Sequence, residues 1–487
     1  MFIKRGYIND LSNILNISYF LTSIFFLFTA IFINEYDATL AFLLYIIITN
    51  VLIFNSRYNN NYFSILYTFY SLFFLLIPLG YILLNENYVF GRGMLELPFL
   101  QDDIRQKLGT SVIQLMLYWI SIWISIYIVS NPKRILKKDK FFKNIKNYEV
   151  LILLSLIGII ISILVYGNWV QKVDQNIAPG VNIFRFLFSD PVIIIYSSIL
   201  FFYLKNTSDI SSKFLDFKFL LILFLYLLNF SYLSSKAGMF ILIVFVFVSI
   251  TSYNNFSNFK IILPTKKSIF IILYISFFLF FLLSSYRSYV SVYSGFDFFK
   301  VIELIKNLNF FDNFIEESER ILIRVSNHGV DQFLLINQSF FKYNLSYSLD
   351  FADYLLKNFV NIILPGTIFV ENYLPSSQLF GDVIFQKELS GKSTEVDLLK
   401  NMNTQPYTPF GLSLILFGKY FSYIIVILYF ILIQKMSLIF KNILFKATMS
   451  LVFFHSLIIY SFEVMIATDI QFFFQLYFIH LLVKGLS

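Results

Sequence analysis

The residues best suited to chemistry lie in the stretch ERILIRVSNHGVDQF, which covers residues 319–333. Arg320, Arg324 and His328 follow one another at intervals of four residues, and Asp331 comes three residues later. On a helix with about 100° per residue, these four side chains fall within about 80° of one another. Two arginines on one face repel each other by roughly 0.2–0.5 kcal/mol. A cationic stripe of this kind therefore needs an explanation.

One explanation is that the stripe binds an anion. An arginine side chain is planar and permanently charged, and it can offer two N–H groups to one phosphate. Arg287 and Lys236 are candidates to complete a pyrophosphate site with these arginines. His328 or Asp331 would then be placed to accept a proton from a sugar hydroxyl as a general base.

The alternative is a solvated helix face held by salt bridges, in which Glu316 supports Arg320. Gly329 also lowers helix stability here by about 1 kcal/mol relative to alanine. A helix interrupted at Gly329 would take Asp331 out of register with the arginines. Both explanations remain open at the level of the sequence.

The composition of the whole chain indicates where these residues must be positioned. The 487 residues are 58% hydrophobic and only 14% charged, whereas a soluble domain has about 25% charged residues. This predicts an all-α polytopic membrane protein. The chain has no cysteine and three histidines, which excludes disulfides, a cysteine nucleophile and a histidine-rich metal site. The net charge of +8 gives no reason to expect a nucleic-acid partner.

Uncharged apolar runs near the length of about 20 residues that crosses a bilayer predict about twelve transmembrane helices. They cover residues 12–33, 38–54, 62–84, 110–130, 150–168, 186–204, 219–235, 237–253, 269–286, 412–433, 447–466 and 470–486.

The basic residues predict the orientation of these helices, because cytoplasmic loops are enriched in lysine and arginine. The densest cluster, NPKRILKKDKFFKNIK at 131–146, is assigned to the inside, and the alternation of the other loops then places both termini in the cytoplasm. Residues 1–286 hold the first nine helices and 409–487 the last three. The segment 287–408 lies outside and contains no clean apolar run.

The long outer loop 287–408 is expected to carry function, because structureless loops of this length are uncommon in compact proteins. Acidic residues outnumber basic ones in it. Amphipathic pieces at 314–336 and 349–364 predict short helices on the outer surface of the bundle. The arginine stripe therefore faces outwards.

Ionisable residues within membrane helices are costly and are functional candidates by default. Those near the outer side are Asp190, Lys236 and Glu463, with Asp469 placed just beyond Glu463 at the end of the run 447–466; Lys419 lies deeper. Each has a structural alternative. Lys236 can extend to the outer interface, Asp190 can cap a helix before a proline, and Glu463 can pair with Lys419. The histidines at 455 and 480 are interpreted as packing residues.

Two motifs resemble the O-antigen polymerase (Wzy) family. LSSKAGMFILIVFVF at 233–247 is similar to the family's small-residue turn with one basic residue, although the family often has arginine where this chain has Lys236. TQPYTPFGLSLILFGKYF at 404–421 resembles the proline- and glycine-rich return to the membrane after the outer loop. The resemblance covers the whole length in architecture, but the Arg-x15-Gly pattern described for some members does not occur.

The resemblance implies a metal-independent glycosyltransferase without a cofactor, in the bacterial inner membrane. A growing glycan on undecaprenyl pyrophosphate would be transferred, at the periplasmic face, to a lipid-linked repeat unit. Arg287, Arg320, Arg324 and Lys236 would stabilise the leaving pyrophosphate, with Asp190, Lys419 and Glu463 in supporting positions. A chain-length regulator protein is a further candidate partner beside the lipid-linked substrates.

Two other functions remain open. An O-antigen ligase has similar architecture and chemistry but uses lipid A–core as the acceptor. A transporter or flippase of lipid-linked sugars would be expected to have inverted repeats and interrupted helices, and no repeat is visible in the sequence.

Overall fold

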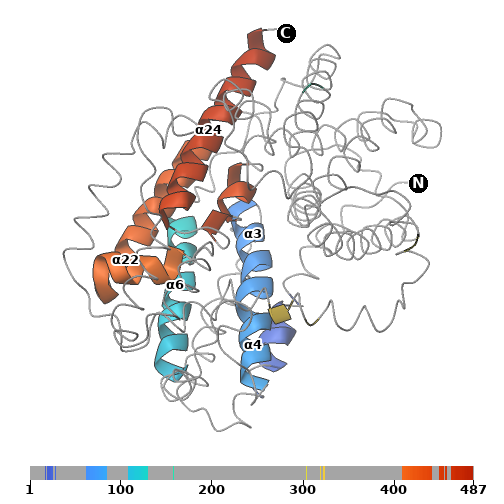
Figure 1. Cartoon of the computed structure of the whole chain (residues 1–487), viewed down its shortest axis with the longest axis vertical. Helices are drawn as coiled ribbons and strands as arrows, with labels where there is room; N and C mark the ends of the chain where they lie inside the picture. The colour runs from blue at the N-terminus through green and yellow to red at the C-terminus, as the bar shows by residue number, and fades with distance from the viewer. Residues whose placement is uncertain are drawn as a thin grey trace.

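A computed structural model gives the structure of the chain and describes part of it. The described residues are 17, 19–25, 28, 62–84, 108–129, 157, 303, 319, 322–323, 409–440, 449–454, 456–457 and 462–485. Within these ranges the chain is almost entirely helical and contains no strand, which confirms the predicted all-α class for this part. Figure 1 shows the described helices as coloured ribbons that lie next to one another. The predicted number of twelve transmembrane helices extends beyond the described residues.

The predicted run 62–84 forms one continuous helical rod in three parts. They are α3 (Tyr62–Ser71), the π-helical turn η1 (Leu72–Leu76) and α4 (Ile77–Leu84). The backbone N–H of Ile77 donates to the carbonyl of Leu72, five residues back. Pro78 follows at once; it has no N–H to donate, and its ring crowds the carbonyl four residues before it. The wider π turn therefore accommodates the proline within the rod.

Helix α6 (Leu108–Val129) corresponds to the predicted run 110–130. Its residues 109–129 are long and apolar enough to cross a membrane, the only helix among the described residues that meets this test. Shorter apolar helices occur at 66–82 and 421–437. One helix of this kind is compatible with a membrane protein.

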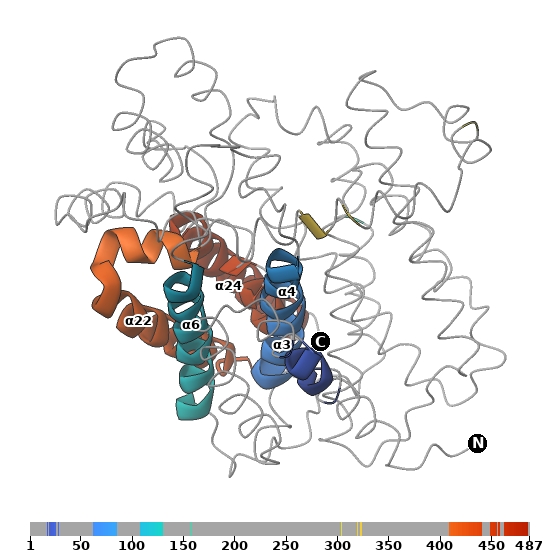
Figure 2. The same ribbon diagram turned by 90° about the horizontal axis from the view of Figure 1, so that it is seen from below.

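Helix α22 (Pro409–Ser437) follows the long predicted loop and contains a sharp break. Its first residue is a proline, whose fixed φ suits a helix start. Gly418 has φ 72° and ψ 174°, the only non-helical dihedral angles inside α22. This region of backbone space is essentially restricted to glycine. Figure 2 shows the resulting bend, with the first part of α22 arching away from the rest.

The bounds of the last helix, α24 (Phe462–Gly485), differ from those predicted from the sequence. The sequence suggested one span ending at residue 466 and another starting at 470, with Asp469 at the outer turn between them. Instead, α24 runs without interruption through 466–470, so this boundary was wrong. The charge of Asp469 was taken as the mark of a turn, whereas its carboxyl has hydroxyl partners inside the bundle.

Side-chain contacts show that α6 and the straight part of α22 run in the same direction. The hydroxyls of Tyr118 and Ser413 lie 2.8 Å apart, and beyond the break at Gly418 the rings of Tyr118 and Tyr423 have centroids 4.7 Å apart. Further along both helices, Gln434 Nε2 donates to Ser125 Oγ at 3.3 Å. Figure 1 shows these two helices side by side.

Helices α22 and α24 are also parallel. Tyr429 contacts Asp469. Phe440, three residues beyond the end of α22, packs against the later Phe473 of α24, with ring centroids 5.5 Å apart. The later position after α22 thus meets the later position on α24. The three helices α6, α22 and α24 form one parallel group.

Aromatic side chains of the helical residues 449–454 and 456–457, the "449–457 segment", connect α3 with α22. Phe454 stacks on Tyr70 at 5.5 Å between centroids, and Phe453 meets Phe430 edge-on at 4.3 Å. Such aromatic pairs contribute about 0.5–1.5 kcal/mol beyond the area they bury. These rings and that of Trp119 in α6 are all buried in the described core.

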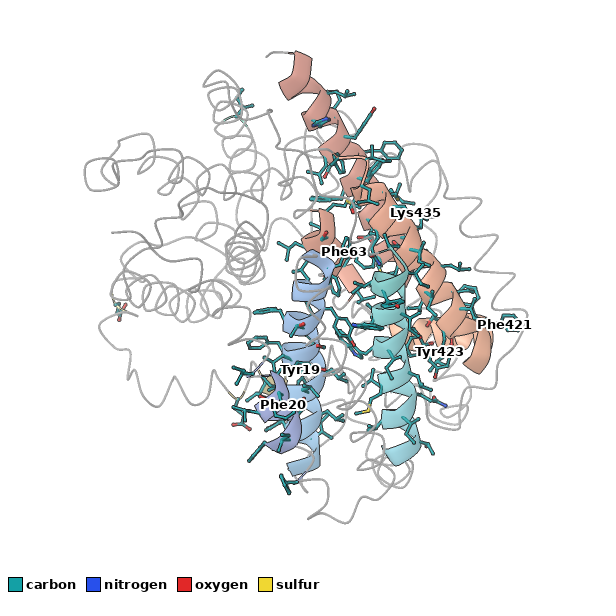
Figure 3. The ribbon with its side chains drawn as sticks, turned by 180° about the vertical axis from the view of Figure 1, so that it is seen from behind. Tyr19, Phe20, Phe63, Phe421, Tyr423 and Lys435 are labelled. Atoms are coloured by element: carbon teal, nitrogen blue, oxygen red, sulfur yellow. The ribbon has the colours of Figure 1, made fainter. Side chains whose placement is uncertain are left out.

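A row of large apolar side chains on α22 faces away from this core. Phe421, Ile424, Leu428 and Leu432 are spaced by three and four residues, and all are more than half exposed. Figure 3 shows Phe421 on the outer side of α22, whereas Tyr423 lies on the side towards α6. Such an apolar surface would be a liability in water, and it suits contact with lipid chains.

Candidate functional site

Asp469, the eighth residue of α24, is completely buried. It is the one acidic or basic side chain that is buried among the described residues. Met465, Phe472 and Leu476 lie three to seven residues from it along the same helix, and all three are buried. Asp469 therefore belongs to the inward face of α24. A carboxyl group in such apolar surroundings needs polar partners, because burial of an unpaired polar or charged group is costly.

Two hydroxyl groups from separate elements supply these partners. The Tyr429 hydroxyl of α22 donates to Oδ2 of Asp469 at 2.7 Å. Ser456 Oγ lies 2.7 Å from Oδ1, where it donates to the carboxylate form. Both distances are typical of well-formed O–H···O hydrogen bonds. The side chain of Asp469 thereby connects α24 with α22 and with the 449–457 segment.

Ser456 has a second acceptor within reach. Its Oγ lies 2.9 Å from the backbone carbonyl of Phe453, three residues earlier in the same helical segment. A serine hydroxyl has one proton and two lone pairs. Its proton can therefore turn towards either the Asp469 carboxyl or the Phe453 carbonyl.

Asp469, Tyr429 and Ser456 form a hydrogen-bonded cluster, here called the Asp469 cluster. The position of Tyr429 along α22 indicates the depth of this cluster in the bundle. Tyr429 lies eleven residues after the break at Gly418 and six residues before the exposed Lys435. At about 1.5 Å rise per residue, it is near the middle of the straight part of α22. If that part crosses a bilayer, the Asp469 carboxyl lies near mid-depth. Intramembrane carboxyl groups of this kind are functional candidates.

A second polar feature runs along the interface between α6 and α22, here called the polar seam. On α6 it consists of the buried residues Ser111, Gln114, Tyr118, Ser121 and Ser125, spaced alternately by three and four residues.

Serine hydroxyls of the seam are largely satisfied within their own helix. Ser121 donates to the Leu117 carbonyl at 2.8 Å and Ser125 to the Ile122 carbonyl at 2.6 Å. Small residues at helix interfaces in membranes allow the backbones to approach closely. The seam therefore serves primarily to pack α6 against α22, with the Tyr118–Ser413 hydrogen bond fixing their register.

Most residues of the site predicted from the sequence lie outside the described residues. This applies to Arg287, Arg320, Arg324, Lys236, His328, Asp331 and Asp190. The backbone of Lys419 is described in α22 and that of Glu463 in α24, but their side chains are not. The pyrophosphate site and its general base therefore stay predictions.

Three residues beside the arginine stripe are described. Glu319, Leu322 and Ile323 are each helical; Glu319 is exposed, and the other two are half-buried. A helical backbone at these positions agrees with the helix that the spacing of the arginines requires.

The sequence interpretation missed the main feature of the described site. Asp469 was considered only as a residue beyond Glu463, and neither Tyr429 nor Ser456 was singled out. The available signal was the position of Asp469 in the apolar stretch MIATDIQFFF. Nothing in the sequence pattern connects it with hydroxyls 40 and 13 residues away.

Among the described residues, no group of three or more His, Asp or Glu side chains is arranged to hold a metal ion. The described cluster can accept, hold or release a proton and can bind hydroxyl groups. Comparison with known proteins gives no further guidance, since no protein-family model, curated protein or solved structure matches this chain.

Proposed function

We propose that the chain polymerises lipid-linked oligosaccharide repeat units of a bacterial surface polysaccharide, at the outer face of the inner membrane. The growing glycan would leave undecaprenyl pyrophosphate and join a hydroxyl of the terminal sugar on a lipid-linked repeat unit. Metal-independent transfer needs fixed cations for the charge that develops on the leaving pyrophosphate. Arg320 and Arg324 supply them, and Arg287 or Lys236 completes the clamp.

The observation that carries this proposal is the form of α22, which begins at a proline and breaks at a glycine. The resemblance to polymerases includes a return to the membrane that is punctuated by proline and glycine after the long outer loop. Helix α22 begins at Pro409 and breaks at Gly418, directly after that predicted loop. The apolar face of Phe421, Ile424 and Leu428 supports the placement of its later part in lipid.

Parallel packing of α6, α22 and α24 gives independent support to the topology behind the proposal. The predicted orientation requires all three to run from the outer to the inner face. The pairs Tyr118–Ser413 and Gln434–Ser125 fit this for α6 and α22. The exposed Lys435, close to the end of α22, suits the cytoplasmic side.

A transporter of lipid-linked sugars is the second candidate, and two observations favour it. Transporters often use broken helices and carry ionisable groups near the bilayer midplane. Gly418 breaks α22, and Asp469 is buried beside the straight part of that helix. The absence of a visible internal repeat and the 287–408 loop favour the polymerase.

A deletion strain separates these functions by what its surface lipid carries. Loss of a polymerase leaves lipid A–core with a single repeat unit. Loss of a ligase leaves core without any unit while polymer accumulates on undecaprenyl pyrophosphate. Loss of a transporter retains single units on the inner leaflet.

The measurement is a gel of surface glycolipid from the deletion strain and from the strain complemented with the wild-type gene. A single-unit band that returns to a ladder on complementation is the expected result. A core-only band would contradict the polymerase proposal, and the location of the stranded units would then distinguish ligase from transporter.

A further inference from the structure

The hydrogen-bond inventory at Ser456 differs between the two protonation states of Asp469. With Asp469 ionised, both neighbours of Ser456 Oγ, the carboxylate at 2.7 Å and the Phe453 carbonyl at 2.9 Å, are acceptors. The single hydroxyl proton can serve only one of them. With Asp469 protonated, its own O–H donates to Ser456 Oγ, and Ser456 donates to Phe453. Both contacts of Ser456 Oγ are then hydrogen bonds, each with its own proton.

Tyr429 fits both states without moving. Its hydroxyl donates to Oδ2 of Asp469 at 2.7 Å, and Oδ2 remains an acceptor when the proton is on Oδ1. The change between states is therefore confined to the Ser456 hydroxyl and to the proton on the carboxyl. When Ser456 turns towards the carboxylate, the Phe453 carbonyl loses a side-chain donor. The cost of this loss is small, because that carbonyl is already part of a helical segment.

Charged groups near Asp469 are few in the described structure. On α22, Tyr429 is the titratable side chain in contact with it, with Tyr423 and the exposed Lys435 each six residues away along the helix. Within α24, His480 lies eleven residues further on. The side chains of His455 in the 449–457 segment and Glu463 in α24 are outside the described residues. No described cation neutralises the carboxylate.

We propose that Asp469 is a proton-binding site within the helical bundle, and that the Ser456 hydroxyl turns as the proton binds or leaves. An O–H bond forms at Oδ1 as the carboxylate takes up a proton from the solvent, where a hydronium ion becomes water, and Ser456 redirects its own proton to the Phe453 carbonyl. The reverse movement releases the proton, and no electron is transferred. Exchangeable protons on buried carboxyls are used by membrane proteins as relays and coupling sites. This proposal does not depend on the polymerase function.

Infrared difference spectroscopy tests it on the full-length protein in lipid, titrated from alkaline to mildly acidic pH. We expect the carbonyl band of a protonated carboxylic acid to appear, and to shift when aspartate is isotopically labelled. Asp469→Asn should remove that band. The asparagine amide can keep the neutral hydrogen-bond pattern, donating to Ser456 and accepting from Tyr429, so the fold should persist.

Substitution of Ser456 tests the second half of the proposal. In Ser456→Ala the acid loses its acceptor, and the carbonyl band should move. In Ser456→Thr a hydroxyl remains, and the band should stay close to the wild-type position. An unchanged band in Asp469→Asn would assign the proton to another residue and overturn the site. If Asp469→Asn fails to fold, the absence of any aspartic-acid band in wild-type protein would overturn it equally. Identical spectra of the alanine and threonine variants would overturn the role of Ser456.

Discussion

At the scale of single residues, the bond from Tyr429 to Asp469 should contribute measurably to stability. Tyr429→Phe removes the donor at 2.7 Å and leaves Oδ2 buried without that partner. Such a loss costs about 1–3 kcal/mol. We expect a lower apparent Tm for Tyr429→Phe in thermal unfolding of the purified full chain, followed by circular dichroism in detergent.

Tyr423 provides a matched control in the same helix. Its hydroxyl is buried and has no hydrogen-bond partner in the structure. Tyr423→Phe makes the identical chemical change without breaking a hydrogen bond, so its Tm should remain at or above that of wild type. Equal losses in both variants would show that the tyrosine hydroxyls act through general packing, contrary to the assigned role of Tyr429.

The arginine stripe makes a separate prediction about activity. If Arg324 holds a pyrophosphate with two N–H groups, lysine cannot reproduce that geometry. Arg324→Lys should therefore shorten the polymer ladder, and Arg324→Ala should raise the barrier more, by roughly 2–4 kcal/mol. A solvated helix face would tolerate either change within about 0.5 kcal/mol.

Complementation of the deletion strain with each variant, at expression matched by blot, measures this effect as polymer length on a gel. Arg320→Ala is tested in parallel, because the two arginines are expected to act together. Wild-type ladders from both alanine variants would refute the clamp and leave a solvated, salt-bridged face.

The sequence indicated candidate residues that lie within one short stretch, but it did not indicate those that come together from separate helices. The stripe of Arg320, Arg324 and His328 follows from spacing alone. The Asp469 cluster depends on contacts between α22, the 449–457 segment and α24, and no periodicity encodes such contacts. The sequence interpretation placed a helix end at Asp469, because burial of a charged residue is costly. The hydroxyl partners that offset this cost cannot be read from the sequence.

At the scale of helices, the break in α22 depends on Gly418. Its φ of 72° and ψ of 174° bring the backbone into a region that a Cβ atom makes unfavourable, at a cost of order 1–3 kcal/mol. Gly418→Ala should lower the apparent Tm accordingly, or straighten α22 and displace the segment before the break. Thermal unfolding measures the first outcome.

Gly411→Ala is the control for this substitution, since Gly411 lies in α22 with helical dihedral angles. Alanine favours a helix over glycine by roughly 0.5–1 kcal/mol. The control variant should therefore be as stable as wild type or slightly more so. A Gly418→Ala protein with wild-type Tm and activity would show that the break has no stabilising role.

Helix existence was easier to predict than helix continuity. The apolar runs 62–84 and 110–130 correspond to described helices with nearly the same ends. Their length and hydrophobicity are local properties of the sequence. The π turn before Pro78, the break at Gly418 and the continuous backbone through Asp469 each depend on how a few backbone groups or side chains are satisfied. Hydropathy does not contain that information.

At the scale of the whole molecule, the parallel packing of α6, α22 and α24 restricts the possible topologies. If all three cross the membrane as we propose, parallel helices of one chain begin on the same side of it. The segments before α6 and before α22 should therefore share a side, and the segment after α6 should lie on the opposite one. The basic cluster at 131–146 follows α6 directly, and the long segment 287–408 precedes α22.

Cysteine labelling tests this arrangement, because the chain contains no natural cysteine. Lys140→Cys lies in the basic cluster, and Ser390→Cys lies in the long loop. An impermeant thiol reagent should label position 390 in intact cells with a permeabilised outer membrane, and position 140 only after lysis. The orientation follows from the preference of lysine and arginine for the cytoplasmic side. Labelling of both positions from outside would contradict the topology and remove the arginine stripe's predicted access to a lipid-linked substrate at the outer face.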